Sequence, residues 1–194
     1  MTSDLGHALL GLLARSERTG YDLALLMRRP IGYFWTAHHS QIYPELARLE
    51  DEGLLTHTVV PGAGPRPTKR YAITADGLDR LRAFLAVAGE PGPVRDLEIL
   101  RLWSLWVLDG AAARALVARG RAEHAARLAA YERELREAQA DPDSRRPDQP
   151  AFASRLTLEG GVRSRRAAVE WCDWMLSELA EAESRRTVST GRKN

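Results

Sequence analysis

The pattern of hydrophobic and polar positions is clearest between residues 40 and 52. There Ile42, Leu46 and Leu49 recur with the spacing of a helix that buries one face. The opposite face is polar or small, which suits a helix that lies along a nucleic-acid groove. This outer face consists of Gln41, Tyr43, Pro44, Ala47 and Arg48.

Two shorter helices are predicted ahead of this segment. An apolar stripe behind Ser3 or Asp4 predicts the first helix, which is expected to end near Ser16. Thr19 is a good N-cap for the second helix, and Asp22 offers a shortened capping box.

A β-hairpin is predicted after the central helix. That helix is expected to begin with Ser40 as its N-cap, to hold Pro44 in its first turn and to stop at Gly53. Residues 55–60 and 68–73 then alternate with a period of two around a turn rich in proline and glycine. This pattern predicts two paired strands.

A change of pattern divides the chain into two domains. A fourth helix is predicted behind Thr74, and the prolines and glycines of residues 89–93 then mark a boundary. We expect a first domain at residues 1–90, a second at 91–186 and a disordered polar tail at 187–194. The second domain shows only helical patterns, at residues 94–108, 109–140 and 151–185, with a mobile charged loop at 141–150.

The last predicted helix carries apolar residues at heptad-like spacing. A helical pair with two apolar faces seldom buries itself alone, so a second copy of the chain is the simplest expected partner. The residues assigned to this homodimer interface are Val162, Val169, Leu176 and Leu179.

Composition and charge narrow the class of protein only slightly. The chain has 194 residues, 44% hydrophobic and 28% charged, and its net charge of +2 does not by itself favour nucleic acid. Its apolar runs are shorter than the roughly 20 residues of a membrane helix, and the amino terminus lacks a secretory signal. The single Cys172 agrees with a reducing compartment. We therefore expect a cytoplasmic protein with no membrane partner.

The order of the predicted elements is that of a winged helix-turn-helix. In such a unit the third helix enters the major groove of double-stranded DNA, and the hairpin, or wing, reaches the flanking backbone or the minor groove. The expected fold is mainly α, with an N-terminal winged helix-turn-helix, a two-stranded β wing and a C-terminal helical dimerisation domain. The same order also suits a scaffold for protein interaction, and it leaves that alternative open.

Three segments closely resemble the signature blocks of the PadR family of bacterial transcriptional regulators. The similarity spans residues 5–85 in order and in spacing, and it departs mainly at residues 64–68, which lengthen the wing. The matching segments are Gly20-Tyr21-Asp22-Leu23, residues 40–54 and residues 69–77.

The rest of the chain resembles, more loosely, the helical C-terminal domain of virulence-gene activators of the AphA type. The similarity consists of Arg95-Asp96, a long helix, and Trp171 and Trp174 in the last helix. The resemblance implies that the C-terminal helices are a dimerisation arm. It also implies a repressor that a ligand or a stress signal releases.

Residue types suggest individual roles at the DNA. Gln41 suits an adenine edge, and Tyr43 suits a phosphate or a thymine methyl group, although its ring could pack on the first helix instead. Arg48 suits a phosphate, and the acidic residues 50–52 are expected where the helix leaves the groove. The candidate DNA contacts are Ser40, Gln41, Tyr43, Pro44, Arg48, Arg66, Lys69 and Arg70.

The sequence gives little support for an enzyme, a cofactor or a metal site. Residues 62–69 superficially resemble a phosphate-binding loop but lack its Gly-Lys-Ser/Thr ending. His38, His39 and His57 lack the spacing of zinc ligands. Cys172 has no recognisable base partner, and it is expected in the helical core rather than as a redox sensor.

The five tryptophans fit two interpretations. Aromatic residues at helical spacing are usually core residues, but they can also form a planar hydrophobic pocket. Such a pocket would bind a small aromatic or amphipathic effector. The candidate pocket residues are Trp35, Trp103, Trp106, Trp171 and Trp174.

These features predict a homodimeric transcriptional regulator, acting as a repressor, that binds a pseudo-palindromic operator in double-stranded DNA. Two-fold symmetry would set its recognition helices about 34 Å apart, or a multiple of that distance. The alternative function is a protein–protein interaction module without DNA binding. Such a module should have an apolar third-helix face, whereas this one carries Gln41 and Arg48.

Overall fold

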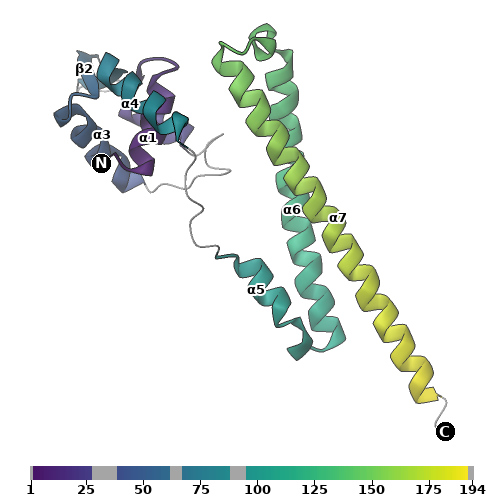
Figure 1. Ribbon diagram of the computed structural model, residues 1–194. Helices are drawn as coiled ribbons and strands as arrows, with labels where there is room; N and C mark the ends of the chain where they lie inside the picture. Colours follow the sequence, from purple (N-terminus) through teal and green to yellow (C-terminus); the bar gives the residue numbers. More distant parts are fainter. Residues whose placement is uncertain (1, 28–38, 62–66, 88–94, 192–194) are drawn as a thin grey trace. The chain divides into compact units, whose positions relative to one another are not determined.

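The chain folds into two compact units, residues 1–92 and 93–194. Their secondary structure is shown in the computed structural model of Figure 1. No helix in the described part of the chain is long and apolar enough to cross a membrane. The structure describes residues 2–27, 39–61, 67–87 and 95–191.

The first unit begins with two capped helices. Helix α1 (Asp4–Leu13) starts where the Ser3 side chain accepts a hydrogen bond from the Gly6 amide at 2.9 Å. Helix α2 (Gly20–Leu26) starts with the predicted capping box, in which Thr19 and Asp22 each bond the other's backbone amide, at 3.2 and 3.1 Å. Both N-terminal predictions are confirmed. Helix α1 ends earlier than predicted, ahead of a short strand β1 (Arg18–Thr19).

Helix α3 (His39–Asp51) is the predicted central helix. It begins two residues before the expected first helical residue, Gln41, so Ser40 lies inside the helix and not at its N-cap, and Pro44 falls in the second turn. The prediction was wrong because first-turn amides need no intrahelical partner, which leaves the starting residue weakly determined. The stop is confirmed, since Gly53 has φ 72° and the Leu54 amide bonds the Leu49 carbonyl at 2.9 Å.

The wing is an antiparallel sheet with the order β1-β3-β2. Strands β2 (Leu55–Val60) and β3 (Thr68–Ile73) agree with the predicted strands. Strand β1 adds a third, short strand that the sequence did not reveal, with Arg18 opposite Tyr71. Two residues are too few for a recognisable alternation. Helix α4 (Ala75–Ala86) follows the predicted Thr74 cap, which accepts from the Gly77 amide at 3.1 Å.

The core of the first unit gathers the apolar faces of α1, α2 and α3 against the sheet. The predicted buried face of α3 is confirmed, because Ile42, Leu46 and Leu49 are almost completely buried. The other fully buried large side chains are Leu9, Leu10 and Leu23. Because one face of α3 is buried in this core, its opposite face lies at the surface.

The second unit is built on a pair of long antiparallel helices, α6 and α7 (Figure 1). Helix α6 (Gly110–Ala140) starts at the predicted Asp109 cap. Helix α7 (Pro150–Gly191) continues beyond the predicted end, because no proline follows its first residue to stop it. The single helix predicted at 94–108 is instead α5 (Leu97–Trp103) and a 3₁₀ turn, η2 (Leu105–Val107).

The connection between the long helices is an ordered turn rather than the mobile loop that was predicted. It forms the 3₁₀ turn η3 (Pro142–Arg145). Ser144 is buried, and its carbonyl accepts a hydrogen bond from Arg155 Nε at 2.9 Å. This bond between η3 and α7 was not detectable from sequence, because the high charge of the segment suggested solvation.

Candidate nucleic-acid interface

The outer face of α3 is exposed along its first two turns. Because Ile42 and Leu46 point into the core, the residues between them face outward. This agrees with the amphipathic pattern of the sequence. The exposed residues of this face are Ser40, Gln41, Tyr43, Pro44 and Ala47.

Tyr43 is held at this face by a glycine of the preceding helix. Its side chain is 45% exposed, and its ring lies so close to Gly20 that a Cβ atom there would be 2.6 Å from Tyr43 Cε1. The ring therefore packs on the start of α2, a contact that the sequence interpretation did not include. The contact fixes one side of the ring and leaves the remainder accessible.

Arg48 is engaged within its own helix. Its guanidinium contacts Glu45 at 2.6 Å and also pairs with Glu52, while Ser3 Oγ donates to Glu45 at 2.5 Å. The hydrogen bonds from Arg48 lower the pKa of Glu45, and Glu45 in turn raises the pKa of Arg48. A phosphate contact by Arg48, as the sequence suggested, would have to compete with both carboxylates.

The acidic end of α3 is joined to the wing. Glu50 contacts His57 Nδ1 on β2 and Lys69 Nζ on β3, the latter at 3.1 Å. The hydrogen bond from His57, followed by that from Lys69, lowers the pKa of Glu50. Lys69 therefore orients the wing against α3 and is less available for DNA than its charge suggests.

Two exposed arginines occupy successive pairs of the β1–β3 register, so their side chains lie on opposite faces of the sheet. Arg70 is the partner of Thr19 in the antiparallel register, next to the Arg18–Tyr71 pair. Hydrogen bonds from Thr19 lower the pKa of Asp22, and the charges of Arg18 and Arg70 lower it further. Arg70 was predicted from sequence. Arg18 was missed because only strand β1 brings it to the wing.

Two of the predicted site residues, Arg66 and Trp35, lie outside the described residues. The remaining tryptophans do not gather into one pocket within the described part of the second unit. Trp103 and Trp106 are 81% and 84% exposed, Trp174 is also exposed, and Trp171 packs partly buried near Val117. The expected common pocket is thus not formed by the four tryptophans that the structure describes.

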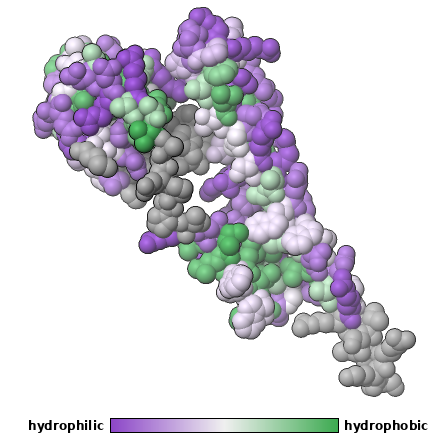
Figure 2. All heavy atoms as spheres, viewed as in Figure 1, coloured by the Kyte–Doolittle hydropathy of each residue, from purple (hydrophilic) through white to green (hydrophobic). Residues whose placement is uncertain are grey.

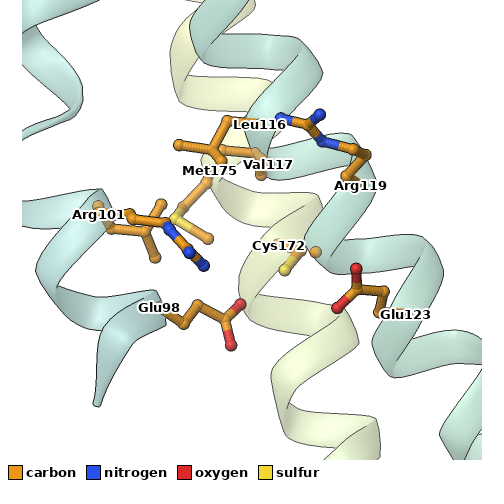
Figure 3. A pocket seen from close by; sticks show the side chains of 10 residues that line it. Glu98, Arg101, Leu116, Val117, Arg119, Glu123, Cys172 and Met175 are labelled. Carbon is orange, nitrogen blue, oxygen red and sulfur yellow. The ribbon is translucent and has the colours of Figure 1, made fainter. Parts of the chain in front are cut away.

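A different cavity opens between α5, α6 and α7 (Figure 3). It has a volume of about 460 Å³ and combines apolar walls with charged side chains. Glu98, Glu123 and the Cys172 thiol turn toward the same space in Figure 3. Burial raises the pKa of Cys172, which agrees with its expected place in the helical core.

The predicted dimer residues are mostly used inside the chain. Val162 is only 3% exposed, and Val169, Leu176 and Leu179 are partly buried. The expected free seam is wrong for Val162, because α7 turns that residue toward α6 in the same chain. Other apolar residues stay exposed, and Figure 2 shows hydrophobic atoms gathered near α5. The exposed large apolar residues of the second unit are Leu97, Ile99, Leu100, Trp103, Trp106, Val107, Leu108, Leu156 and Trp174.

Comparison with known proteins assigns each unit to a family. Residues 9–83 match the transcriptional regulator PadR-like family, and residues 94–180 match the virulence activator alpha C-terminal family. The chain is 33% identical over 189 residues to a probable transcriptional regulator of Mycobacterium tuberculosis, covering 92% of this chain and 96% of that protein. It is 29% identical over 177 residues to the negative transcriptional regulator PadR of Bacillus subtilis, covering 90% and 97%.

Solved structures agree with this assignment. Bacillus subtilis PadR in complex with operator DNA has a TM-score of 0.82 at 29% identity, with 91% of this chain and 99% of that chain covered. The same protein in complex with p-coumaric acid has a TM-score of 0.77 at 28% identity, with 91% and 95% covered. The Vibrio cholerae virulence activator AphA has a TM-score of 0.71 at 29% identity, with 92% and 99% covered. The chain therefore belongs to the PadR-like family of transcriptional regulators.

Proposed function

We propose that the protein is a transcriptional repressor that binds a pseudo-palindromic DNA operator as a homodimer. The observation that carries this proposal is the exposed polar face of α3. Gln41 and Tyr43 are exposed on this face, and the other face of the helix is buried in the core. Arg18 and Arg70 add positive charge on the adjoining sheet. A helix of this kind suits the major groove, and flanking cations suit the phosphate backbone.

The relatives support the same function. Bacillus subtilis PadR is named a negative transcriptional regulator, and its structure has been solved with operator DNA. The competing function, a protein-interaction module without DNA binding, would favour an apolar outer face on α3. The polar face observed here supports DNA binding instead.

The homodimer is supported by the exposed apolar residues of the second unit. Trp103, Trp106 and Trp174 are large hydrophobic side chains that water contacts in the isolated chain. Burial of such a surface against a second copy stabilises an isologous dimer, in which the same patch is used twice. A two-fold dimer would place its α3 helices about 34 Å apart, or a multiple of that distance, to match successive major-groove faces.

A small aromatic or amphipathic effector is the third part of the proposal. Bacillus subtilis PadR has been solved with p-coumaric acid, an aromatic acid. In this chain the cavity between α5, α6 and α7 offers Leu102 and Met175 as apolar walls and Arg101 and Arg119 as cations. Arg101 and Arg119 suit the anionic end of such an effector, and the Glu98 and Glu123 carboxylates of the same cavity suit a hydroxyl group that donates hydrogen bonds.

Selection of bound sequences from random DNA duplexes tests the proposal. We expect enrichment of one palindromic sequence, with affinity that falls as salt rises because phosphate contacts release counterions. Tyr43→Ala should weaken binding to that sequence about tenfold or more, within the roughly 1–3 kcal/mol of a specific base contact, and should leave the dimer intact. Ser16→Ala, at an exposed position on the α1–β1 connection, is the control. Failure to enrich any palindrome would contradict the proposed function.

A further inference from the structure

Three different metal-ligating side chains meet next to the cavity of the second unit. Glu98 comes from α5, His124 from α6 and Cys172 from α7, and one ligand atom from each lies within 4.8 Å of the other two. His124 is 8% exposed and Cys172 is 1% exposed. Among the residues that the structure describes, these three bring a thiol, an imidazole and a carboxylate close enough to share one metal ion.

The distances between these atoms are near those of a tetrahedral metal site. His124 Nε2 lies 2.9 and 3.1 Å from the two carboxylate oxygens of Glu98. Zinc bonds of about 2.0–2.3 Å separate neighbouring ligand atoms by roughly 3.3–3.8 Å. Small side-chain rotations would bring the imidazole, the thiolate and one carboxylate oxygen to that spacing.

The surroundings leave room for a fourth ligand. Glu98 and Cys172 both line the cavity of about 460 Å³, so a cation at this point would be reached from solvent through it. Figure 3 shows the Glu98 carboxylate and the Cys172 sulfur turned toward that space. Thiolate and imidazole ligands favour zinc and similar borderline cations over magnesium or calcium, which prefer oxygen ligands.

We propose that Glu98, His124 and Cys172 bind a divalent cation of the zinc class, which fastens α5 to the α6–α7 pair. Helix α5 gains most from such a link, because none of its residues is buried in the described chain. It also carries Leu97, Leu100 and Trp103 of the exposed apolar surface. The cation would therefore stabilise the position of the surface that a second copy covers, and this last consequence rests on the proposed homodimer.

Arg165 provides the competing, metal-free arrangement. Its guanidinium lies 3.2 Å from His124 Nδ1, and an arginine can only donate, so Nδ1 accepts and the Nε2 proton points to Glu98. Cation binding at Nε2 would move that proton to Nδ1, where it would oppose the Arg165 donor. Arg165 must then turn away, and on binding the Cys172 thiol releases its proton to solvent.

Titration with Co²⁺ tests the site, using the full chain after treatment with a chelator. We expect one Co²⁺ per chain, a thiolate-to-cobalt charge-transfer band in the near ultraviolet, and loss of that band when Zn²⁺ is added. Cys172→Ser should abolish the band. His124→Gln and Glu98→Gln should weaken Zn²⁺ binding about tenfold or more, a loss that even outer-shell changes can cause at metal sites.

Two matched pairs of variants make the test specific. Glu132→Gln alters a carboxylate of the same helix as His124 that pairs with Arg166 outside the group, so it should change Zn²⁺ affinity little. Arg165→Leu should strengthen binding, whereas Arg163→Leu, which removes an exposed arginine paired with Glu159 on the same helix, should not. Circular dichroism checks that each variant keeps its helices.

The proposal is overturned if stoichiometric Co²⁺ gives no charge-transfer band, or if the band survives Cys172→Ser in a folded protein. Sedimentation with and without Zn²⁺ then tests the consequence for assembly. If Zn²⁺ tightens the wild-type dimer and has no such effect on His124→Gln, the consequence for assembly is supported. If Zn²⁺ leaves the wild-type dimer unchanged, that consequence is contradicted. The two proposals can fail separately. If the protein binds the metal but selects no operator sequence, the proposed repressor function is contradicted and the metal site is still supported.

Discussion

In the first unit, leucines from three helices converge on one core, whereas in the second unit three tryptophans lie exposed at the surface. Leu9, Leu23 and Leu46 are completely buried in the first. In the second, Trp103 and Trp106 are more than four-fifths exposed. A domain that buries its apolar residues within one chain can fold alone, while exposed aromatic patches on a helical pair indicate a partner. The difference supports the proposal that the first unit contacts DNA and the second unit forms the dimer.

The largest expected effect comes from the core that makes the first unit independent. Leu46→Ala leaves a cavity behind α3 and should lower the free energy of unfolding of the first unit by about 2–5 kcal/mol. Chemical denaturation followed by circular dichroism, with DNA binding measured in parallel, checks this. We expect the dimer to persist at denaturant concentrations where DNA binding is lost. One shared transition for both properties would show that the two units do not unfold separately.

The next effect concerns the apolar surface of the second unit. Trp103→Ala should weaken the dimer by about 2 kcal/mol, or roughly thirtyfold, as expected for an aromatic side chain at the centre of an interface. Sedimentation across a concentration series measures this change. Tyr21→Ala is the matched control, because Tyr21 is a comparably exposed aromatic residue of the first unit.

Val162→Ala sharpens the same contrast. Because Val162 packs inside the chain, its truncation should lower the stability of the second unit by about 1 kcal/mol or more and affect the dimer less than Trp103→Ala does. The outcome that contradicts this assignment is a dissociated dimer with unchanged unfolding.

A smaller effect is expected at the start of α2. Thr19→Ala removes one partner of the capping box and should cost about 1 kcal/mol of the first unit's stability. Thr157→Ala is a useful comparison, because Thr157 lies within α7 and its hydroxyl bonds only the Ala153 carbonyl. Thermal unfolding of both variants should show the larger shift for Thr19→Ala.

The smallest effect is a dependence of the first unit on pH. Hydrogen bonds from Arg48 and His57 lower the pKa values of Glu45 and Glu50 in the folded state. Their stabilising contribution is therefore complete above the ordinary glutamate pKa of about 4.3 and is lost as the pH falls through the lower folded values. Glu45→Gln should reduce this loss in acid denaturation curves. A loss of equal size in the variant would assign the effect to other groups.

Several features were predictable because they depend on neighbours in the sequence. The caps at Ser3, Thr19 and Thr74 use side chains within three residues of the amides that they bond. The buried face of α3 follows from helical periodicity, which is fixed by backbone geometry. The family resemblance, carried by similarly local segments, is confirmed by the comparisons.

Other features were not predictable because they depend on contacts between distant segments. Strand β1 depends on pairing with β3, which places Arg18 opposite Tyr71 in the sheet. Arg48 looked available for a phosphate until its contacts with Glu45 and Glu52 were known. The exposed sides of helices in the second unit depend on how α6 and α7 turn toward each other, and a repeating apolar pattern does not fix that rotation.

The sequence alone determined where most helices and strands lie, which side of α3 is buried and to which family the chain belongs. These properties follow from periodicity, capping and short motifs, whose energies act over a few residues. Tertiary structure decided which charges remain available around α3, which apolar residues stay exposed, and that Glu98, His124 and Cys172 meet. Those outcomes depend on packing between helices far apart in the chain, which is set by many weak contacts at once.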